Sequence, residues 1–272
     1  MKKYLTLLFT IYSSVLLNAQ NTSLVKLDDV RLIKNSKIIV ALTNFEEINL
    51  SLKNTVRNFW SFCPISDFMP EKEAFLKAEK EQGFVVMKID GAGSDKEWNI
   101  SIYDKDENTL IKNQLPLGHG YDETFAFGLF SMQYLCKTMD ESNSKNNLRW
   151  NSLYKVKSAE LKTKKLYILD SDLDSDLDKE KIKENYQYPI EVVSYDKWKD
   201  AILNKTEGVA YCIIVPFIMY LNSQSGQAQQ ERLFLFHYLV EAKSGVVYSI
   251  EKDHKKIKKS SIRDYNDVAS KE

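Results

Sequence analysis

The apolar positions of the first half predict one α/β unit. Short β-branched runs, typical of buried strands, alternate with stretches in which apolar residues recur at helical spacing. A strand–helix–strand–helix–strand order predicts parallel pairing with right-handed crossovers, and a closing hairpin adds antiparallel strands. The predicted strands are residues 37–42, 63–68 and 84–89, the helices are residues 46–60 and 71–82, and the hairpin is residues 98–103 and 109–112.

The second half repeats this pattern. Residues 33–40 align with residues 161–168 at an offset of 128, and residues 63–83 align without a gap with residues 188–208 at an offset of 125. Both blocks keep the same order of strand and helix signals, which indicates an internal duplication. The predicted strands are residues 166–169, 190–193 and 209–215, the helices are residues 176–186 and 195–204, and the hairpin is residues 232–240 and 246–250.

A very apolar helix is predicted between the two copies, over residues 123–139, with Asp122 as its N-cap. Its pattern leaves almost no polar face, so neighbouring elements must cover it on several sides. The predicted fold class is therefore α/β: a tandem pair of βαβαβ-type units, each with a mixed sheet extended by an antiparallel hairpin, packed about a central apolar helix.

The expected division of the chain follows from these elements. It comprises a signal peptide (1–20), a first α/β unit (21–115), a connecting helix and linker (116–152), a second α/β unit (153–252) and a charged tail (253–272). Residues 141–147 predict a flexible linker. The tail predicts either a frayed segment or a loose helix.

The N-terminus has the layout of a secretory signal peptide. Lys2 and Lys3 precede an apolar run over residues 4–17, and Ala19 offers a small residue for cleavage, so the mature chain would start at Gln20 or Asn21. The alternative is a membrane anchor, but the run is shorter than the roughly 20 residues that span a bilayer. No cysteine follows the run, so no lipobox is present, and the expected location is periplasmic or extracellular.

The rest of the chain shows no obvious membrane-spanning segment and no overall excess of basic residues. The longest later apolar run, residues 209–221, contains Pro216 and predicts a buried strand, so no transmembrane segment is expected after cleavage. The chain has 38 basic and 38 acidic residues; without Lys2 and Lys3 the balance is 36 to 38, a net charge of −2. Nucleic acid is therefore not an expected partner.

Three cysteines lie in apolar surroundings and do not form the dense framework of a disulfide-stapled domain. Buried free cysteines are favoured, although any one pair could form a bridge in an oxidising compartment. The three are Cys63, Cys136 and Cys212.

Five aspartates at alternate positions, residues 170–178, directly follow a predicted strand. Ligands gather beyond the carboxyl ends of strands in α/β sheets, and clustered carboxylates suit a hard cation. Asp170, Asp172 and Asp174 are therefore candidate ligands of a divalent cation, and no other cofactor is expected. The run does not fit a calcium loop, because Ser175 stands where glycine is needed and Lys181 where a bidentate glutamate is needed.

A strand that ends in Asp170-Ser171-Asp172, followed by a strand ending in Ser194 and a helix with Lys197 and Lys199, resembles haloacid-dehalogenase-type phosphatases. The resemblance covers about thirty residues and implies Asp170 as nucleophile and Asp172 as general acid.

The chain departs from that family's pattern at several points. No Thr or Val follows Asp172 at the expected place, residues 209–217 end without the acidic pair that would hold magnesium, and the spacing is too compact. The simpler interpretation is that the acids cap the following helix and face solvent.

A second candidate site precedes the central helix. Gly118, His119 and Gly120 stand at its predicted N-terminus, where backbone N–H groups can hold an anion and a histidine can exchange protons near neutral pH. A turn followed by a cap would also explain these residues.

The absence of a convergent catalytic motif favours an exported non-enzymatic binding or interaction protein of the cell envelope. Its expected partner is an unknown envelope protein or a small ligand held between the units. The alternative is a metal-dependent, phosphatase-like hydrolase that uses the 170–178 acidic run.

Overall fold

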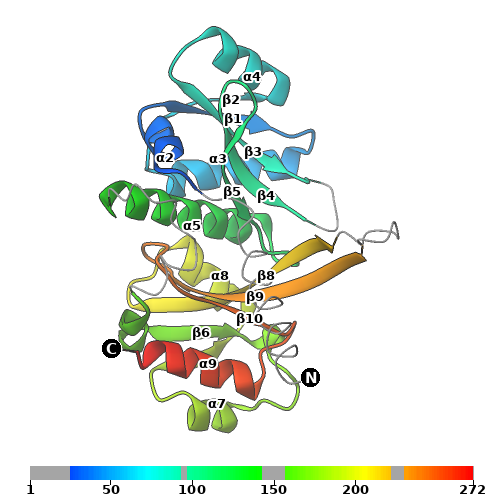
Figure 1. The fold of residues 1–272 in the computed structure, drawn as a ribbon. Coiled ribbons are helices and arrows are strands. Elements are labelled where there is room, and N and C mark those ends of the chain that lie inside the picture. The colour runs from blue at the N-terminus through cyan, green and yellow to red at the C-terminus, as the bar shows by residue number, and fades with distance from the viewer. Residues whose placement is uncertain (1–24, 93–96, 143–156, 222–229, 272) are drawn as a thin grey trace, which may run out of the picture.

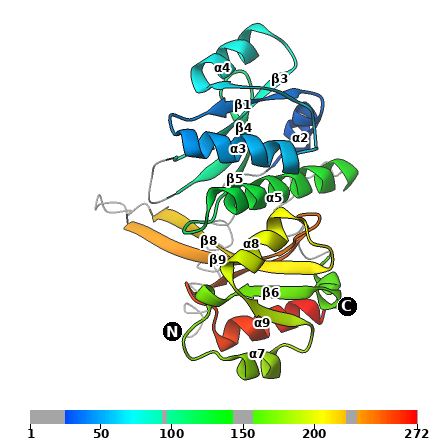
Figure 2. The same ribbon diagram turned by 180° about the vertical axis from the view of Figure 1, so that it is seen from behind.

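The computed structural model describes residues 25–92, 97–142, 157–221 and 230–271 (Figures 1 and 2). The predicted signal peptide and most of the predicted linker lie outside these residues. The described part contains two five-stranded mixed sheets with helices, as the sequence predicts.

The first sheet has the strand order β2-β1-β3-β4-β5. β1 pairs in parallel with β2 and β3, and the β4–β5 hairpin extends the sheet with antiparallel strands. The strands are β1 (Lys37–Leu42), β2 (Ile65–Pro70), β3 (Phe84–Asp90), β4 (Asn99–Tyr103) and β5 (Thr109–Gln114); the helices are α2 (Leu27–Lys34), α3 (Glu46–Phe59) and α4 (Glu71–Lys80).

The second sheet repeats this topology, with the order β10-β9-β8-β6-β7. β6 pairs in parallel with β7 and β8, and β9 and β10 are antiparallel. The strands are β6 (Lys165–Leu169), β7 (Ile190–Val193), β8 (Val209–Leu221), β9 (Gln230–Glu241) and β10 (Val247–Asp253); the helical elements are η1 (Ser158–Thr163), η2 (Asp170–Asp172), α7 (Lys179–Asn185), α8 (Tyr195–Leu203) and α9 (Lys259–Ala269).

The pairing of the first and third strands in each unit agrees with the internal repeat of the sequence. Lys37 pairs with Phe84 in the first sheet, and Lys165 pairs with Val209 in the second. These pairs differ by the two offsets seen in the sequence: 128 for the first strand of each unit (37 to 165) and 125 for the third (84 to 209). The two units therefore share one topology and the same register between their first and third strands, whereas the β1–β2 pairing has a register shift that the β6–β7 pairing lacks.

Helix α5 (Tyr121–Ser142) lies between the two sheets in both views (Figures 1 and 2). It packs with α2, α3, β4 and β5 on the first unit and with α8 on the second. The Phe130 ring lies edge-on to Phe59 of α3, 4.7 Å between centroids, and the Phe127 ring lies edge-on to Tyr238 of β9, 5.3 Å between centroids. One helix thus contributes to the apolar cores of both units.

The two units differ on the sheet face that α4 and α8 cover. In the second unit this face carries Ile213 and Val215, and α5 packs beside α8. The equivalent residues of the first unit, at an offset of 125, are Lys88 and Asp90. Only the second unit therefore has an apolar face to bury at this position, which explains why α5 packs there.

Two details of the helices differ from the sequence predictions. Asp122 lies inside the first turn of α5 and accepts a hydrogen bond from Ser51 Oγ at 2.5 Å, so the prediction that it precedes the helix as a cap was wrong. On α4, the apolar pattern predicts that Phe75, Leu76 and Ala78 face inward, but the buried residues are Ala74 and Ala78, and Leu76 is 41% exposed.

The C-terminal tail contains a packed helix. α9 contacts η1, α7 and β10, and Tyr265 and Ile262 are fully buried. It follows β10 as α5 follows β5, so each unit ends in a helix that covers its sheet.

Cys63, Cys136 and Cys212 are all buried and unbridged. Among the described residues, no helix combines the length and the apolar character needed to cross a bilayer.

Candidate functional site

A cavity of about 670 Å³ lies where β6 ends, and it brings together the two candidate sites of the sequence. Gly118 and His119 enter it from the segment before α5, and Ser171 and Asp172 enter from the turn after β6. Its volume falls within the range that is usual for small-ligand sites. The remaining lining residues are Leu117, Leu169, Tyr195, Ile214, Pro216, Ile218, Leu233, Leu235 and Lys255.

Only one aspartate of the acidic run reaches the cavity. Asp170 is exposed and does not line it, Asp174 accepts a hydrogen bond within its own turn, and Asp178 caps α7 by accepting from Lys181 N at 2.8 Å. Within the described ranges, no three His, Cys, Asp or Glu side chains are grouped to hold a metal ion. The capping interpretation therefore explains Asp178, and Asp172 is the member of the run that lines the cavity.

His119 and Asp172 are both partly buried, and the charge of each affects the pKa of the other. Burial lowers the pKa of His119, and the charges of Asp172 and Glu123 partly oppose this shift. Burial raises the pKa of Asp172, and His119, Lys256 and His237 partly oppose it. A neutral imidazole presents one donor and one acceptor. The Oδ2 atom of Asp172 is buried and has no hydrogen-bond partner among the described residues, so its capacity to accept a hydrogen bond is unused there.

The anion position at the start of α5 is already filled by the protein. Glu123 is fully buried, and its Oε1 accepts hydrogen bonds from Gly120 N at 2.5 Å and from Tyr195 Oη. A carboxylate here is stabilised by the positive end of the helix. Gly120 allows this approach, because a Cβ on it would lie 2.8 Å from Glu123 Oε1 and 3.0 Å from Tyr195 Oη. Gly120 is therefore structural, and of the predicted trio only Gly118 and His119 face the cavity.

The His119 ring is supported by α8. Its centroid lies 5.0 Å from that of Trp198, which is fully buried and donates from Nε1 to the Cys212 carbonyl at 3.2 Å. The Tyr195 ring stacks on the Trp198 ring, with 6.3 Å between their centroids. The position of His119 is thus set by packing against the second unit as well as by its own loop.

A second buried histidine lies on the sheet behind the cavity. His237 of β9 is fully buried; its Nε2 lies 2.7 Å from the His254 carbonyl oxygen, and its Nδ1 lies 2.5 Å from Tyr265 Oη. A carbonyl can only accept, so Nε2 carries the proton and Nδ1 accepts from the tyrosine. Burial lowers the pKa of His237 despite the neighbouring carboxylates of Asp253 and Asp172. His237 stands in a run of aromatic and apolar residues, 233–239, which favours a hydrogen-bonded core or sheet-face histidine over a ligand, and this network fits that interpretation.

The apolar wall of the cavity comes from the long β8–β9 ribbon. Ile214, Pro216 and Ile218 lie on one face of β8, and Leu233 and Leu235 lie beside them on β9. β8 pairs with β6 only as far as Tyr211, so within the described ranges its edge beyond that point pairs with no strand. The Ile218 N–H on this edge donates a hydrogen bond to Glu97 Oε1 at 3.2 Å. Pro216 lies two residues earlier on the same edge, where a missing N–H costs no sheet hydrogen bond.

Several residues of the site could not be found from the sequence. Tyr195 and Glu123 are far apart in the chain and meet only because α5 packs on α8. Lys255 was assigned to the tail, but β10 and α9 place it at the cavity. The sequence signals were the position of Asp172 directly after a strand and the position of Gly118 and His119 before a helix.

Comparison with known protein families, with curated proteins and with solved structures finds no match to this chain.

Proposed function

We propose that the protein is an exported, non-enzymatic binding protein of the cell envelope. Its ligand is a small molecule with an apolar body and a head group that donates hydrogen bonds. The observation that carries this proposal is the convergence of His119 and Asp172 in a cavity that has an apolar wall formed by β8 and β9. The ribbon residues Ile214, Ile218 and Leu235 would contact the apolar body.

Asp172 determines which head group the ligand needs. A buried carboxylate oxygen without a donor costs roughly 1–3 kcal/mol, and a donor on the ligand would remove that cost. His119 beside it offers both a donor and an acceptor. An alkylammonium ion or an alkyl alcohol has these properties, whereas an alkyl carboxylate would place a second negative charge beside Asp172.

The test compares n-octylammonium, octanol and octanoate as ligands in thermal unfolding. We expect octylammonium to raise the unfolding temperature in a concentration-dependent manner and octanoate to raise it less, because a ligand stabilises the state that binds it. Asp172→Asn should abolish the difference between the two. Asp170→Asn is the matched control, because Asp170 is exposed outside the cavity, and it should behave as the wild type. Equal responses of the wild type and Asp172→Asn would contradict the proposal.

The alternative, a metal-dependent hydrolase using the 170–178 run, has less support, since Asp172 is the only aspartate of the run that lines the cavity. The same two variants test it. Turnover of a generic phosphate ester with magnesium that disappears in both Asp170→Asn and Asp172→Asn would favour the hydrolase over the binding protein.

Export is a separate part of the proposal and rests on the Lys2–Lys3 start and the apolar run that follows. We expect the secreted or periplasmic chain from a secreting host to begin at Gln20 or Asn21, as read by N-terminal sequencing. An exported chain that retains Met1, or a chain found only in the cytoplasm, would contradict this part and leave the cavity unaffected.

A further inference from the structure

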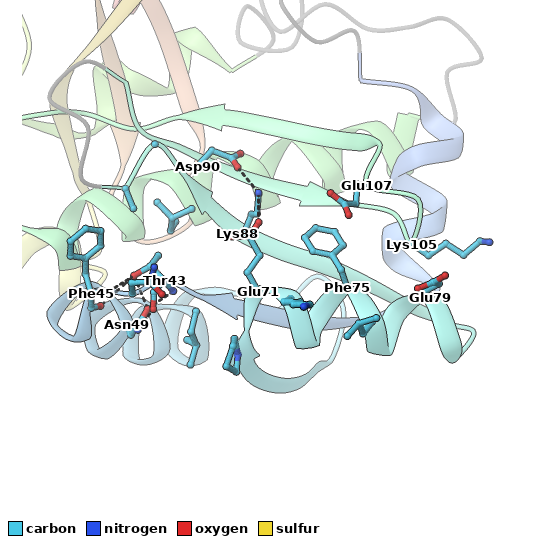
Figure 3. Close-up of a pocket in the computed structure, with 18 of the residues that line it drawn as sticks. Thr43, Phe45, Asn49, Glu71, Phe75, Glu79, Lys88, Asp90, Lys105 and Glu107 are labelled. Carbon is cyan, nitrogen blue, oxygen red and sulfur yellow. Dashed lines mark hydrogen bonds and ion pairs between the residues drawn. The ribbon is translucent and has the colours of Figure 1, made fainter.

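The first unit has a cavity at the same edge of its sheet. It measures about 1240 Å³ and lies where β1, β2 and β3 end, next to α4 (Figure 3). Thr43 and Asn44 line it, and at an offset of 128 they are the counterparts of Ser171 and Asp172 in the other cavity. Both units of the duplication therefore keep a cavity after the first strand, but the second unit has a carboxylate where the first has a neutral amide.

We propose that this first-unit cavity is a second ligand site, and that it takes an uncharged saccharide. This inference does not depend on the ligand proposed for the second unit, because the two cavities share no lining residue.

The polar floor of the cavity suits hydroxyl groups. Lys88 Nζ lies 2.7 Å from Glu71 Oε1 and 3.3 Å from Asp90 Oδ1, and Figure 3 shows it between these two carboxylates. An ammonium group has three N–H donors, and the carboxylates have further lone pairs. Each hydroxyl of a saccharide is at once a donor and an acceptor, so it can bond to a lysine and a carboxylate that lie side by side.

These polar groups are held in place before any ligand arrives. Asp90 Oδ2 accepts from Ser101 Oγ at 2.5 Å and from Tyr103 Oη at 2.7 Å. At the other wall, Asn49 Oδ1 accepts from Thr43 N at 2.8 Å, and Asn49 Nδ2 donates to the Thr43 carbonyl at 2.8 Å. A site whose side chains are already fixed loses less conformational entropy on binding.

The rim supplies apolar surface for the C–H faces of sugar rings. Phe45 is 49% exposed and Leu76 is 41% exposed, and both line this cavity. Among the large hydrophobic residues that are exposed in the described ranges, Tyr195 and Leu233 line the other cavity. Single exposed apolar residues are common on protein surfaces, but here they occur at both cavities. In Figure 3 the Phe75 ring lies between Lys88 on one side and Glu79 and Lys105 on the other.

The charge of the lining disfavours an anionic ligand. Three lysines line the cavity against five carboxylates, a local balance of 3 − 5 = −2. An anion would meet net repulsion. The lysines are Lys72, Lys88 and Lys105, and the acids are Glu71, Glu79, Asp90, Asp106 and Glu107.

The experiment measures binding to the full chain by isothermal titration calorimetry. The neutral probes are maltotriose, cellotriose and the trimer of N-acetylglucosamine; the charged probes are the trimers of galacturonate and glucosamine. We expect at least one neutral trimer to bind. Lys88→Met, which keeps the aliphatic stem and removes the donor, should weaken that binding about ten-fold or more. Phe45→Ala, a change at the exposed rim, should weaken it without affecting folding.

Two control variants locate the site. Lys80→Met makes the same chemical change on α4 outside the cavity lining and should bind as the wild type. Asp172→Asn should also leave saccharide binding unchanged, which separates this inference from the site of the second unit. Binding of only charged trimers, binding of no trimer at millimolar concentration, or neutral binding that survives both Lys88→Met and Phe45→Ala would overturn the proposal.

Discussion

Phe127→Ala is expected to lower the free energy of unfolding by about 3–5 kcal/mol. Phe127 is fully buried on α5, and its ring packs edge-on against Tyr238 of the second sheet. Truncation removes this aromatic contact and leaves a cavity between α5 and β9, in a core that cannot fully collapse because α5 is also packed against α3. The measurement is urea unfolding followed by circular dichroism.

Phe45→Ala is the matched control, since it makes the same change at a ring that is 49% exposed. It should change the free energy of unfolding by no more than about 0.5 kcal/mol. A loss below about 1 kcal/mol for Phe127→Ala would show that α5 does not bind the two units together. Two separate urea transitions in the wild type would indicate the same.

The topology could be predicted because each unit satisfies local rules. The β-branched runs, the glycines after α4 and α8, and the hairpin glycine are all visible in the sequence. Gly83, Gly208 and Gly245 have φ values of +85°, +73° and +73°, the backbone conformation that favours glycine. The internal repeat supported the predicted order of strands and helices, because the elements predicted in one unit could be compared with those in the other.

The packing of α4 and the tail helix could not be predicted in the same way. Phe75 and Leu76 are more apolar than Ala74 and Ala78, so the pattern favoured burying them. α4 nevertheless lies close to β1 and β3, where the alanines pack against Ile39. For α9, the many lysines before the helix made the segment look like a solvent-exposed tail. The helix is amphipathic, and its apolar residues are buried because it packs beside β10.

The site was predictable in its parts but not as a whole. Asp172 follows a strand and His119 precedes a helix, and both positions are typical of ligand sites in α/β proteins. Their meeting depends on α5 carrying the end of the first unit onto the second. Long-range packing of this kind leaves no local signal in a single sequence.

Helices α5 and α9 follow the last strand of their units but differ in how much of their surface is apolar. α5 is apolar on nearly all sides and is covered by the second unit, whereas α9 buries one face and presents Arg263 and Asp267 outside it. The first unit has Lys88 and Asp90 at the positions equivalent to Ile213 and Val215, the apolar residues on the corresponding sheet face of the second unit.

Acidification is expected to destabilise the fold, chiefly through His237. Because burial lowers the pKa of His237 below its usual 6.5, the unfolded chain binds a proton more readily than the folded chain. The contribution of the buried neutral histidine to the free energy of unfolding is therefore fully present above about pH 6.5. It is lost as the pH falls below that value, by at most about 1.4 kcal/mol per pH unit for each such histidine. The pKa of His119 is also lowered, so its protonation adds to the loss of stability on acidification. The raised pKa of Asp172 has the opposite effect at lower pH.

The measurement is urea unfolding between pH 7.5 and about pH 5. His237→Gln cannot titrate in this range, yet its amide can still donate to the His254 carbonyl and accept from Tyr265, so its stability should depend less on pH than that of the wild type. His254→Gln is the control, because the His254 side chain is exposed and only its backbone carbonyl bonds His237. If His237→Gln loses as much stability on acidification as the wild type, another group must cause the acid sensitivity, and the buried His237–Tyr265 pair is not its origin.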